Sequence, residues 1–326
     1  MAYYAGADLG ATKITAIVGD RDATVLGRDR RLTPQGPSGI DVTEAVLGSV
    51  RAACESAGIS PDQIVAAGIG SFGPFDLAQG MVVNPTNLPD SVTRIPLVGP
   101  MEELIGTDRV YLHNDTTAGV IGERFHASRN PDDMVYLTIS TGIGAGIAVD
   151  GNVLEGWDGN AGEVGHITLD PTGRLTCGCG IDGHWEAYAS GSGIPRYTRS
   201  LAEELPSAED SLVPYEASDF TAADVFAVAG EDDFADAVID RIATWNCLGV
   251  ANLVHAYAPL VITLGGAVAL HNEAAIMDPI RDRLDDLVMS NVPELRMTEL
   301  GDDVVVHGAL ASALTRGTGD RSMLRS

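Results

Sequence analysis

Residues Gly156 to Glu186 read GWDGNAGEVGHITLDPTGRLTCGCGIDGHWE, and reactive side chains are concentrated in this stretch. Cys177 and Cys179 lie two residues apart, His184 follows five residues later, and His166 stands upstream. Two thiols and two imidazoles make the four ligands that a closed structural zinc site needs. The stretch therefore predicts a zinc ion that orders a loop too rich in glycine to order itself.

Two other states of these cysteines have to be weighed. A disulfide between Cys177 and Cys179 is disfavoured because the two residues are too close in sequence for ordinary bridge geometry. Cys54 and Cys247 are isolated in the sequence and offer the only other pairings. Thiols that bind no metal remain the alternative to zinc.

Glu163 and Glu186 flank the predicted metal site without being obvious ligands. Carboxylates fixed on a rigid loop can accept hydrogen bonds from the vicinal hydroxyls of a sugar, and such charge-assisted bonds are strong. The alternative is a pair of solvated glutamates in a very acidic chain.

The N-terminus predicts two short strands, within residues 3–18, around a glycine-rich turn. Backbone N–H groups of the turn, with Thr12 and Lys13, can surround a phosphate, and Asp8 can hold a magnesium ion through water. A similar turn, Ser140 to Gly146, follows an apolar strand at 134–139. It precedes a hairpin partner at 147–153, so the βαβ crossover of a dinucleotide-binding fold is absent.

The same first half continues with a third strand at 22–32, a helix from a capping box at 41–44 to Gly58, and a strand at 64–69. The order βββαβ is typical of one half of an actin-like domain, although other α/β folds share it. A further strand, 110–113, ends at Asn114-Asp115, where a carboxylate can take the proton of an attacking alcohol. Asp115 can also be a simple helix N-cap.

The remaining chain predicts an acidic region at 200–236 with an exposed loop at 207–219, then a helix from 234 to 257. A strand at 260–264 leads to Gly265-Gly266. A helix at 274–289, a strand at 304–307 and a last helix from Ala309 complete it.

The motifs Gly162-Glu163-Val164-Gly165-His166, Cys177-Gly178-Cys179-Gly180 and His184-Trp185-Glu186 resemble the signature of the ROK family of sugar kinases and repressors. Asp-Leu-Gly-Ala-Thr-Lys at 8–13 is similar to the family's first phosphate motif, with Ala11 in place of a common glycine. The family commonly has cysteine where this chain has His184, and histidine can also ligate zinc.

This resemblance implies an α/β protein with the actin/hexokinase-like (ribonuclease H-like) fold, in which two similar domains flank a cleft. We expect a small domain at 1–118, a large domain at 119–308, and a C-terminal helix, about 309–326, that packs back on the small domain. The resemblance also implies Mg-ATP and a structural zinc ion. The expected nucleotide contacts are Asp8, Gly10, Thr12, Lys13, Thr141, Gly142, Gly144, Gly265 and Gly266.

The implied activity is an ATP-dependent hexose kinase that phosphorylates the 6-hydroxyl of glucose, with Asp115 as general base. The expected sugar contacts are Asn87, Asn114, Glu163, His166 and Glu186. Alternatives within the family are a fructokinase, an N-acetylhexosamine kinase and a sugar-responsive regulator. Such regulators carry a DNA-binding helix-turn-helix ahead of the kinase-like part, whereas this chain starts at the first phosphate motif.

The composition excludes several classes of protein. With 46 acidic and 20 basic residues the net charge is −26, so a surface that binds nucleic acid is not expected. No apolar run is long enough to cross a membrane, and the N-terminus lacks the pattern of a signal peptide. We expect a cytoplasmic protein, as a homodimer or higher homo-oligomer.

The charge also suggests an environment. Lys13 is the only lysine, and an excess of acidic residues without lysine is typical of proteins from salt-loving organisms, where screening suppresses self-repulsion. An ordinary acidic protein is the alternative.

Overall fold

The computed structural model of the protein describes residues 2–325. Its chain forms two compact units. The first consists of Met1–Met134, Gly146–Gly162 and Asp302–Ser326, and the second of Val135–Ala145 and Glu163–Gly301. These bounds differ from the expected division after residue 118, because helix α3 (Asp115–His126) runs through that point and packs against helix α10 (Val304–Thr315) inside the first unit.

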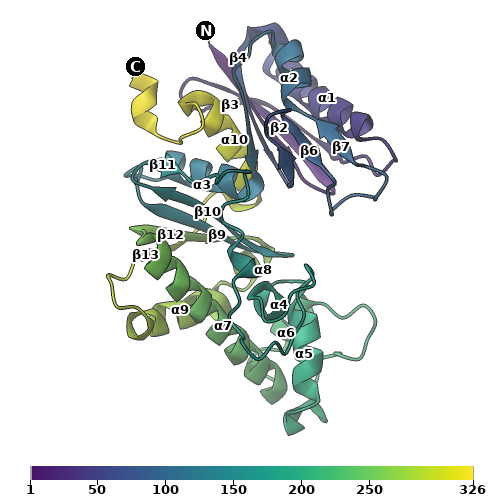
Figure 1. Ribbon diagram of the computed structural model, residues 1–326, viewed down its shortest axis with the longest axis vertical. Coiled ribbons are helices and arrows are strands. Elements are labelled where there is room, and N and C mark those ends of the chain that lie inside the picture. The colour runs from purple at the N-terminus through teal and green to yellow at the C-terminus, as the bar shows by residue number, and fades with distance from the viewer. Residues whose placement is uncertain (1, 326) are drawn as a thin grey trace. The chain divides into compact units, whose positions relative to one another are not determined.

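A five-stranded sheet with the order β3-β2-β1-β4-β8 organises the first unit (Figure 1). Its strands are β1 (Tyr3–Leu9), β2 (Lys13–Asp20), β3 (Val25–Leu32), β4 (Ile64–Ser71) and β8 (Val110–Asn114). The first three are antiparallel neighbours, while β4 pairs in parallel with both β1 and β8. The strands expected in this half are thus confirmed, and the carboxyl ends of β1, β4 and β8 lie at one edge of the sheet.

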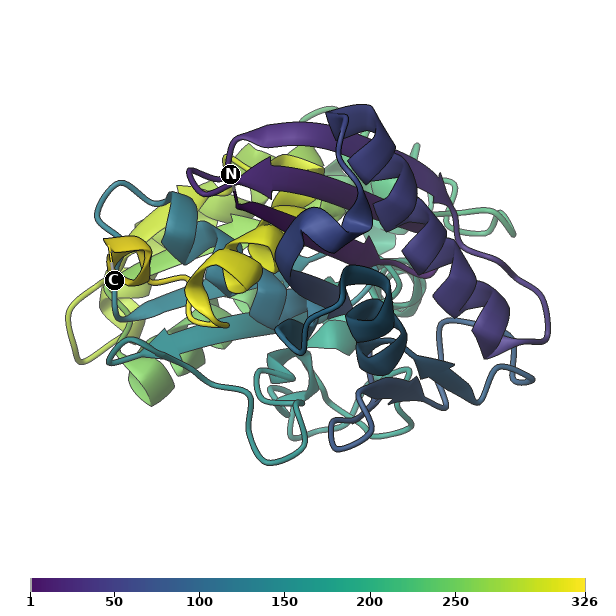
Figure 2. The same cartoon turned by 90° about the horizontal axis from the view of Figure 1, so that it is seen from above.

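Each face of this sheet is covered by helices (Figures 1 and 2). On one face, α1 (Gly39–Ala57) and α2 (Val98–Ile105) share a core with inward residues of β2 such as Ile14. On the other face, Ile17 packs with side chains of α3 and α10, such as Ile121 and Leu310. The alternation of Ile14 and Ile17 between two cores follows from the two-residue period of a strand.

Helix α1 ends where the sequence predicts, at Gly58 with a φ of 71°, but the predicted capping box at 41–44 is wrong. The helix begins at Gly39, and Asp41 lies inside its first turn. Gly39 lies so close to β7 (Arg94–Pro96) that a Cβ there would be 1.8 Å from the carbonyl oxygen of Arg94. The first residue of the helix, two positions before the predicted box, therefore has to be glycine.

The strand predicted at 304–307 is also wrong, because these residues form the first turn of α10. A short apolar run cannot be assigned to strand or helix by periodicity alone. Here the run continues to Thr315 and lies against the sheet, where glycines admit its backbone: a Cβ on Gly68 would come 1.9 Å from the carbonyl oxygen of Ala309. The close approach of helix and strand therefore needs glycine at this position.

A small antiparallel sheet that the sequence did not indicate completes the first unit. Its strands β5 (Phe75–Asp76), β6 (Met81–Val83) and β7 pair in that order. The turn between β6 and β7 carries Asn87.

The second sheet has the order β11-β10-β9-β12-β13. Its strands are β9 (Met134–Ile139), β10 (Ile143–Val149), β11 (Asn152–Val153), β12 (Val261–Gly265) and β13 (Glu294–Met297). Sequence analysis placed β9 and β12, but not β13. The hairpin partner predicted at 147–153 is displaced, because β10 begins at Ile143, inside the predicted turn, and ends at Val149, after which β11 forms a separate short strand. The second unit also contains α4 (Glu186–Ala189), α5 (Ile194–Ala202), α6 (Ala222–Phe226), α7 (Asp233–Tyr257), α8 (Ala267–His271) and α9 (Glu273–Leu287). The two long helices, α7 and α9, agree with the predicted ones to within two residues.

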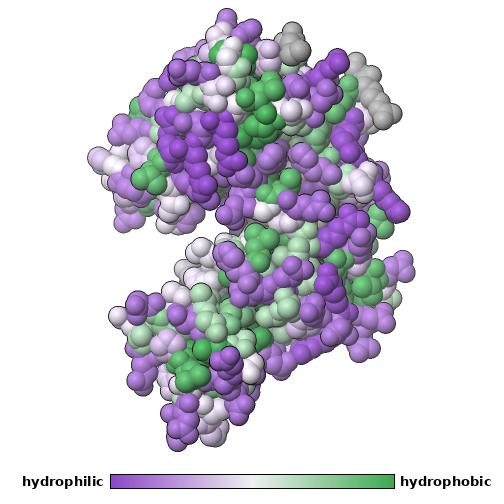
Figure 3. All heavy atoms as spheres, turned by 180° about the vertical axis from the view of Figure 1, so that it is seen from behind, coloured by the Kyte–Doolittle hydropathy of each residue, from purple (hydrophilic) through white to green (hydrophobic). Residues whose placement is uncertain are grey.

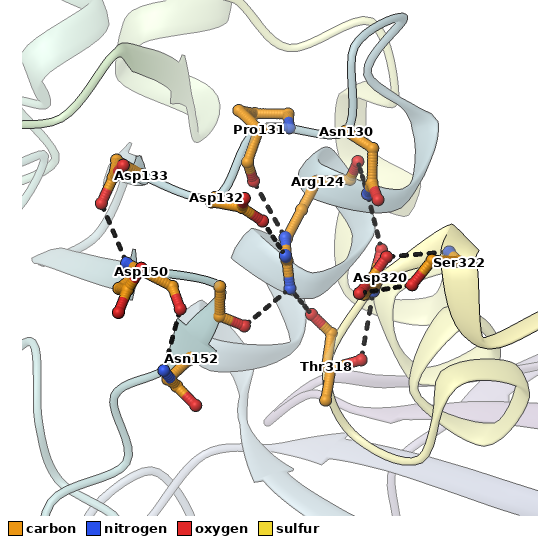
Figure 4. A network of polar contacts seen from close by, with 12 residues as sticks. Arg124, Asn130, Pro131, Asp132, Asp133, Asp150, Asn152, Thr318, Asp320 and Ser322 are labelled. Atoms are coloured by element: carbon orange, nitrogen blue, oxygen red, sulfur yellow. Dashed lines mark hydrogen bonds and ion pairs between the residues drawn. The ribbon is translucent and has the colours of Figure 1, made fainter.

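The guanidinium of Arg124, which is 1% exposed, anchors the end of the chain to α3 (Figure 4). It donates to the carbonyl oxygens of Pro131, Gly151 and Thr318 and to the carboxylate of Asp132, at 2.6–2.9 Å. Asn130 adds a bond from its amide to the carbonyl oxygen of Gly319. Because a buried charge is tolerated only when it is fully hydrogen-bonded, this network fixes the turn after α10.

None of the described helices is long and apolar enough to cross a membrane. Figure 3 shows one face of the molecule, on which hydrophilic residues cover most of the surface and hydrophobic ones form small patches.

Replacing Gly68 by alanine should separate α10 from β4, since the added methyl would overlap the backbone of Ala309. We expect Gly68→Ala to lower the free energy of unfolding by about 1–3 kcal/mol, the usual cost of overpacking. Gly99→Ala is the matched control, because nothing lies within 4 Å of its added Cβ. Urea unfolding followed by circular dichroism measures both, and equal midpoints for the two variants would contradict the close packing.

Candidate active site

The four predicted metal ligands lie together in the second unit. One donor atom from each of His166, Cys177, Cys179 and His184 falls within a group whose members are all within 4.8 Å of one another. Cys177 Sγ is 3.7 Å from His166 Nδ1, and Cys179 Sγ is 3.3 Å from His184 Nδ1. Tetrahedral zinc with ordinary bond lengths separates a sulfur from a nitrogen ligand by about 3.6 Å, so the cluster fits a zinc ion.

A tight turn brings the two cysteines together. The amide of Cys177 donates to the carbonyl oxygen of Ile181, and the amide of Gly180, with a φ of 87°, donates to that of Cys177. Burial raises the pKa of the Cys177 thiol to about 11. A cation at this position would stabilise the thiolate and remove that penalty.

Trp185 fixes the downstream end of the metal loop to α7. Its side chain is fully buried, and its Nε1 donates to Asn246 Oδ1 at 3.0 Å. The indole lies directly over Gly249, where a Cβ would come 2.4 Å from the ring. The loop therefore has an anchor that does not depend on metal.

The orientation of His166 gives its two ring nitrogens different partners. Nδ1 faces Cys177, and Nε2 is 3.7 Å from a carboxylate oxygen of Glu163. A metal on Nδ1 leaves the N–H on Nε2, where it can donate to Glu163 or to a sugar hydroxyl. Burial, with a contribution from Glu186, raises the pKa of Glu163, while His166 opposes that rise.

Glu186 joins the metal loop to the second glycine-rich turn. One of its carboxylate oxygens accepts a hydrogen bond from the amide of Ile143 at 2.9 Å, and the other faces Cys177 Sγ at 3.5 Å. Gly142 lies against the same carboxylate, and a Cβ there would be 2.5 Å from its Oε2. A predicted sugar contact and a predicted phosphate turn are thus brought together.

The second glycine-rich turn is held through its carbonyl oxygens. Those of Ser140 and Thr141 accept bonds from the amides of Gly191 and Ser192, at 2.7 and 3.1 Å, and the hydroxyl of Ser192 also donates to Thr141. Gly144 continues into β10. Because the carbonyls are bound from behind, the turn can present N–H groups to a phosphate.

Gly265 is the last residue of β12, and Gly266 follows it as the N-cap residue of α8. Gly266 has a φ of 86°, and a Cβ on it would be 2.6 Å from the carbonyl oxygen of Ile139. A Cβ on Gly265 would come equally close to the hydroxyl of Tyr136. Both glycines are therefore required by packing alone, whatever they bind.

The first glycine-rich turn is fixed in the same manner as the second. The hydroxyl of Thr33 donates to the carbonyl oxygen of Gly10 at 2.7 Å, and the side-chain amide of Gln35 (Nε2) donates to that of Ala11 at 2.8 Å. The carbonyl oxygen of Thr12 accepts from the amide of Thr33. Within residues 2–325 the turn amides of Ala11 and Thr12 make no hydrogen bond, so they can donate to a phosphate beside Lys13.

Asp8 and Asp115 form the acidic part of the first unit's site. Asp8 stands near the end of β1, in register with Gly70 of β4 and through it with His113 of β8, two residues before Asp115. Burial and the negative charge of Asp115 raise the pKa of Asp8 from 3.8 to about 7, and Lys13 opposes the rise. Such a carboxylate is well suited to a divalent cation, which would relieve the repulsion.

Asn114, and not Asp115, is the N-cap residue of α3. Its Oδ1 accepts from the amide and the hydroxyl of Thr116, both at 2.9 Å. Asp115 is exposed in the first helical turn, and its Oδ1 also accepts from the amide of Thr116 at 2.7 Å. Asn87 is exposed in the turn after β6. The exposed Asp115 carboxylate is therefore accessible to a ligand.

A pocket of about 790 Å³ lies in the first unit beside the small sheet. Its lining includes Asp76, Leu77 and Arg94 from that sheet, and Trp157 and Asp158 from the loop that leads to Glu163. Trp157 is 94% exposed. The pocket combines an aromatic face with carboxylates, although none of the predicted site residues lines it.

The side chains that hold the two turns were missed by sequence reasoning. Thr33 and Gln35 belong to the Thr-Pro-Gln segment after β3, and Ser192 belongs to Ser-Gly-Ser-Gly at 190–193. Clusters of small polar residues and proline read as ordinary loops. Only their position beside the glycine-rich turns gives them a role.

Comparison with known proteins shows to which family the chain belongs. A model of the ROK family matches residues 4–316. The chain belongs to the ROK family. It is 36% identical to a glucokinase of Pyrobaculum calidifontis over 321 residues, which are 96% of this chain and 95% of that protein.

Two solved ROK structures are similar over nearly the whole chain. A ROK hexokinase from Thermus thermophilus is 33% identical, with a TM-score of 0.78 over 95% of this chain and 97% of that one. A ROK glucokinase from Streptomyces griseus in complex with glucose and AMPPNP is 28% identical, with a TM-score of 0.73 over 95% and 99%. The expected actin/hexokinase-like fold is thereby confirmed for this ROK chain.

Loss of the metal cluster should destabilise this ROK protein, because the cysteine turn would keep the buried Cys177 thiol without a cation. We expect Cys179→Ser to reduce bound zinc from about one ion per chain to nearly none and to lower the melting temperature. Cys247→Ser, outside the cluster, should retain the metal. Elemental analysis and thermal melts with and without a chelator measure this, and an unmodified protein that purifies without zinc at full stability would refute it.

Asp8 should make the ligand-free protein less stable as pH rises. The pKa of Asp8 is higher in the folded protein than in the unfolded chain. The folded protein is therefore fully stable below pH 4, where Asp8 is neutral in both states, and it loses free energy of unfolding as pH rises through about 7 and the carboxyl ionises. In magnesium-free buffer at pH 8, the free energy of unfolding of Asp8→Asn should exceed that of the unmodified protein by about 2–4 kcal/mol. At pH 4 the two values should differ little. Asp108→Asn, at an exposed site, is the control. Parallel pH profiles for Asp8→Asn and the unmodified protein would contradict the assignment.

Proposed function

We propose that this protein is an ATP-dependent kinase that transfers the γ-phosphoryl group of Mg-ATP to the 6-hydroxyl of glucose. The observation that carries the proposal is the pair Asp8 and Asp115, whose charges interact at the carboxyl edge of the first sheet. A kinase needs one carboxylate for the metal and one for the acceptor hydroxyl. Membership of the ROK family and the likeness to a glucokinase complexed with glucose and AMPPNP support the same activity.

The nucleotide would be held by groups from both glycine-rich turns. Asp8 would bind magnesium through water, and the amides near Gly10, with Thr12 and Lys13, would contact phosphate oxygens. Thr141, Gly142 and Gly144 would form a second phosphate contact. Gly265 and Gly266 would present a flat backbone to the adenosine.

Glucose would be oriented by carboxylates and amides and deprotonated by Asp115. The proposed sugar contacts are Asn87, Asn114, Glu163, His166 and Glu186. Asp115 would accept the proton of the 6-hydroxyl as the oxygen attacks phosphorus, and help of this kind contributes about 10²–10⁴ in rate. Because its carboxylate is exposed, this proton transfer needs no rearrangement of a buried charge.

Zinc would have a structural role in this mechanism. Bound by His166, Cys177, Cys179 and His184, it would fix the tautomer of His166 and the position of Glu163 beside it. Its chemistry is confined to ordering the loop, since four protein ligands leave no open position for substrate.

The proposed preference for glucose over fructose or N-acetylhexosamines is supported by the likeness to a glucokinase complexed with glucose and AMPPNP. Three further proposals rest on sequence alone: assembly as a homodimer or higher homo-oligomer, a cytoplasmic location, and adaptation to high salt. A sugar-responsive regulator is the non-enzymatic alternative, and it would bind sugar without turnover.

Asp115→Asn should abolish most turnover and preserve ligand binding. We expect kcat for glucose to fall by about 10²–10⁴, since the amide cannot accept the proton, while calorimetry gives glucose and AMPPNP affinities close to those of the unmodified protein. Asp108→Asn serves as the control for loss of one charge.

The same coupled ADP-release assay, run at high and low salt, compares glucose, fructose, mannose and N-acetylhexosamines. Turnover of Asp115→Asn at the unmodified rate would remove Asp115 as the base. Sugar binding by the unmodified protein without ADP release would favour the regulator.

A further inference from the structure

His113 is a buried side chain next to the proposed site that the mechanism above does not use. It lies in β8, two residues before Asp115, and is 7% exposed. Its Nδ1 is 2.6 Å from Glu155 Oε1, and its Nε2 is 2.7 Å from Ser312 Oγ. Both ring nitrogens are therefore committed to partners within the first unit.

The partners define which atom donates. The bond to His113 holds the pKa of Glu155 below its usual value, so the carboxylate is ionised and can only accept. Nδ1 then carries the hydrogen and donates to Glu155. In the neutral ring Nε2 accepts from the hydroxyl of Ser312, which is fully buried on α10.

The imidazole has little freedom to move. The turn after α10 lies over it, so that a Cβ on Gly317 would be 3.6 Å from its Cε1. The network of Arg124 fixes that turn through the carbonyl oxygen of Thr318 (Figure 4). The His113 side chain is thus held rigidly, with its Nδ1 hydrogen directed at the carboxylate of Glu155.

Glu155 begins the segment 155–162, which ends directly before Glu163. The loop is closed on itself, since the amide of Ala161 donates to the carbonyl oxygen of Glu155 at 3.2 Å. Gly159 packs against Leu77, where a Cβ would come within 3.3 Å of the side chain. Among the hydrogen bonds and ion pairs of the described residues, only the Glu155–His113 contact ties this loop to β8 through side chains.

We propose that His113 is a positioning residue for sugar binding, which acts by holding the loop 155–162 against the end of β8 through Glu155. This inference rests on the proposed kinase function. The tether fixes the loop's first residue next to β8, which ends at Asn114 directly before Asp115, and so limits the freedom of the chain that enters Glu163. A loop ordered before binding costs less entropy when the sugar arrives, so the tether should increase affinity for sugar.

Glu155→Ala tests the proposal with little risk to the fold, because the Glu155 side chain is half exposed. We expect KM for glucose to rise roughly threefold to thirtyfold, the range of coupling between contacting residues, with kcat changed by less than about twofold. Hydrogen exchange of the amides at 155–162 should become faster. Glu55→Ala, which removes the same charge from an exposed position on α1, should change neither quantity.

A double-mutant cycle shows whether the effect passes through the histidine. His113→Gln and Glu155→Ala together should raise KM no further than the larger single change, because both remove one contact. Ser312→Ala provides a second variant if His113→Gln does not fold, and it should raise KM less than Glu155→Ala because the loop bond remains.

Two results would overturn the positioning role. One is a folded Glu155→Ala protein with unchanged KM and unchanged exchange at 155–162, and the other is fully additive effects in the cycle. An unmodified protein without kinase activity would instead refute the proposed function, and hydrogen exchange in Glu155→Ala would still decide whether the tether holds the loop.

Discussion

The carboxylate of Glu186 is the contact on which the second unit's site depends. It accepts a hydrogen bond from the amide of Ile143 and faces the thiol of Cys177, so one side chain links the glycine-rich turn to the cysteine turn. Gly142 has to be glycine because any side chain would occupy the same space. Trp185, immediately before it, is locked over Gly249, which sets the position of Glu186 from the core outward. A disturbance at either turn is therefore felt at the other.

Both glycine-rich turns follow one physical rule, although they belong to different units. In each, polar residues from a distant segment bind the carbonyl oxygens: Thr33 and Gln35 serve the first turn, and Gly191 and Ser192 the second. A peptide whose carbonyl is bound from behind directs its N–H group forward, which creates an electropositive concavity without lysine or arginine. This matters in a chain of net charge −26 with a single lysine, because its phosphate sites have to be made largely from backbone.

The motifs and regular elements were accessible to sequence reasoning, and the tertiary contacts were not. Cys177, Cys179 and the two histidines indicated a metal cluster, because ligand type and spacing can be recognised in a short stretch of sequence. Residues 304–307 misled because a valine run suits a strand, and only the close approach of Ala309 to Gly68 shows that a helix lies there. Asn114, and not Asp115, caps α3, so the N-cap alternative for Asp115 is wrong and its carboxylate is available for the proposed role as general base. His113 and Glu155 are 42 residues apart, and no periodicity signals such a pair.

The first unit is built from both ends of the chain and from Gly146–Gly162, and the second unit occupies the two remaining segments between Met134 and Asp302. Its sheet is complete once residue 114 has been made, but the apolar face around Ile17 and Gly68 is covered by α3 together with α10, and α10 is among the last residues to be synthesised. During translation this face stays partly exposed until α10 is made, whereas the second unit, whose residues all precede 302, can already fold. The first unit therefore completes its core last, and its uncovered apolar surface would most need chaperones just before synthesis ends.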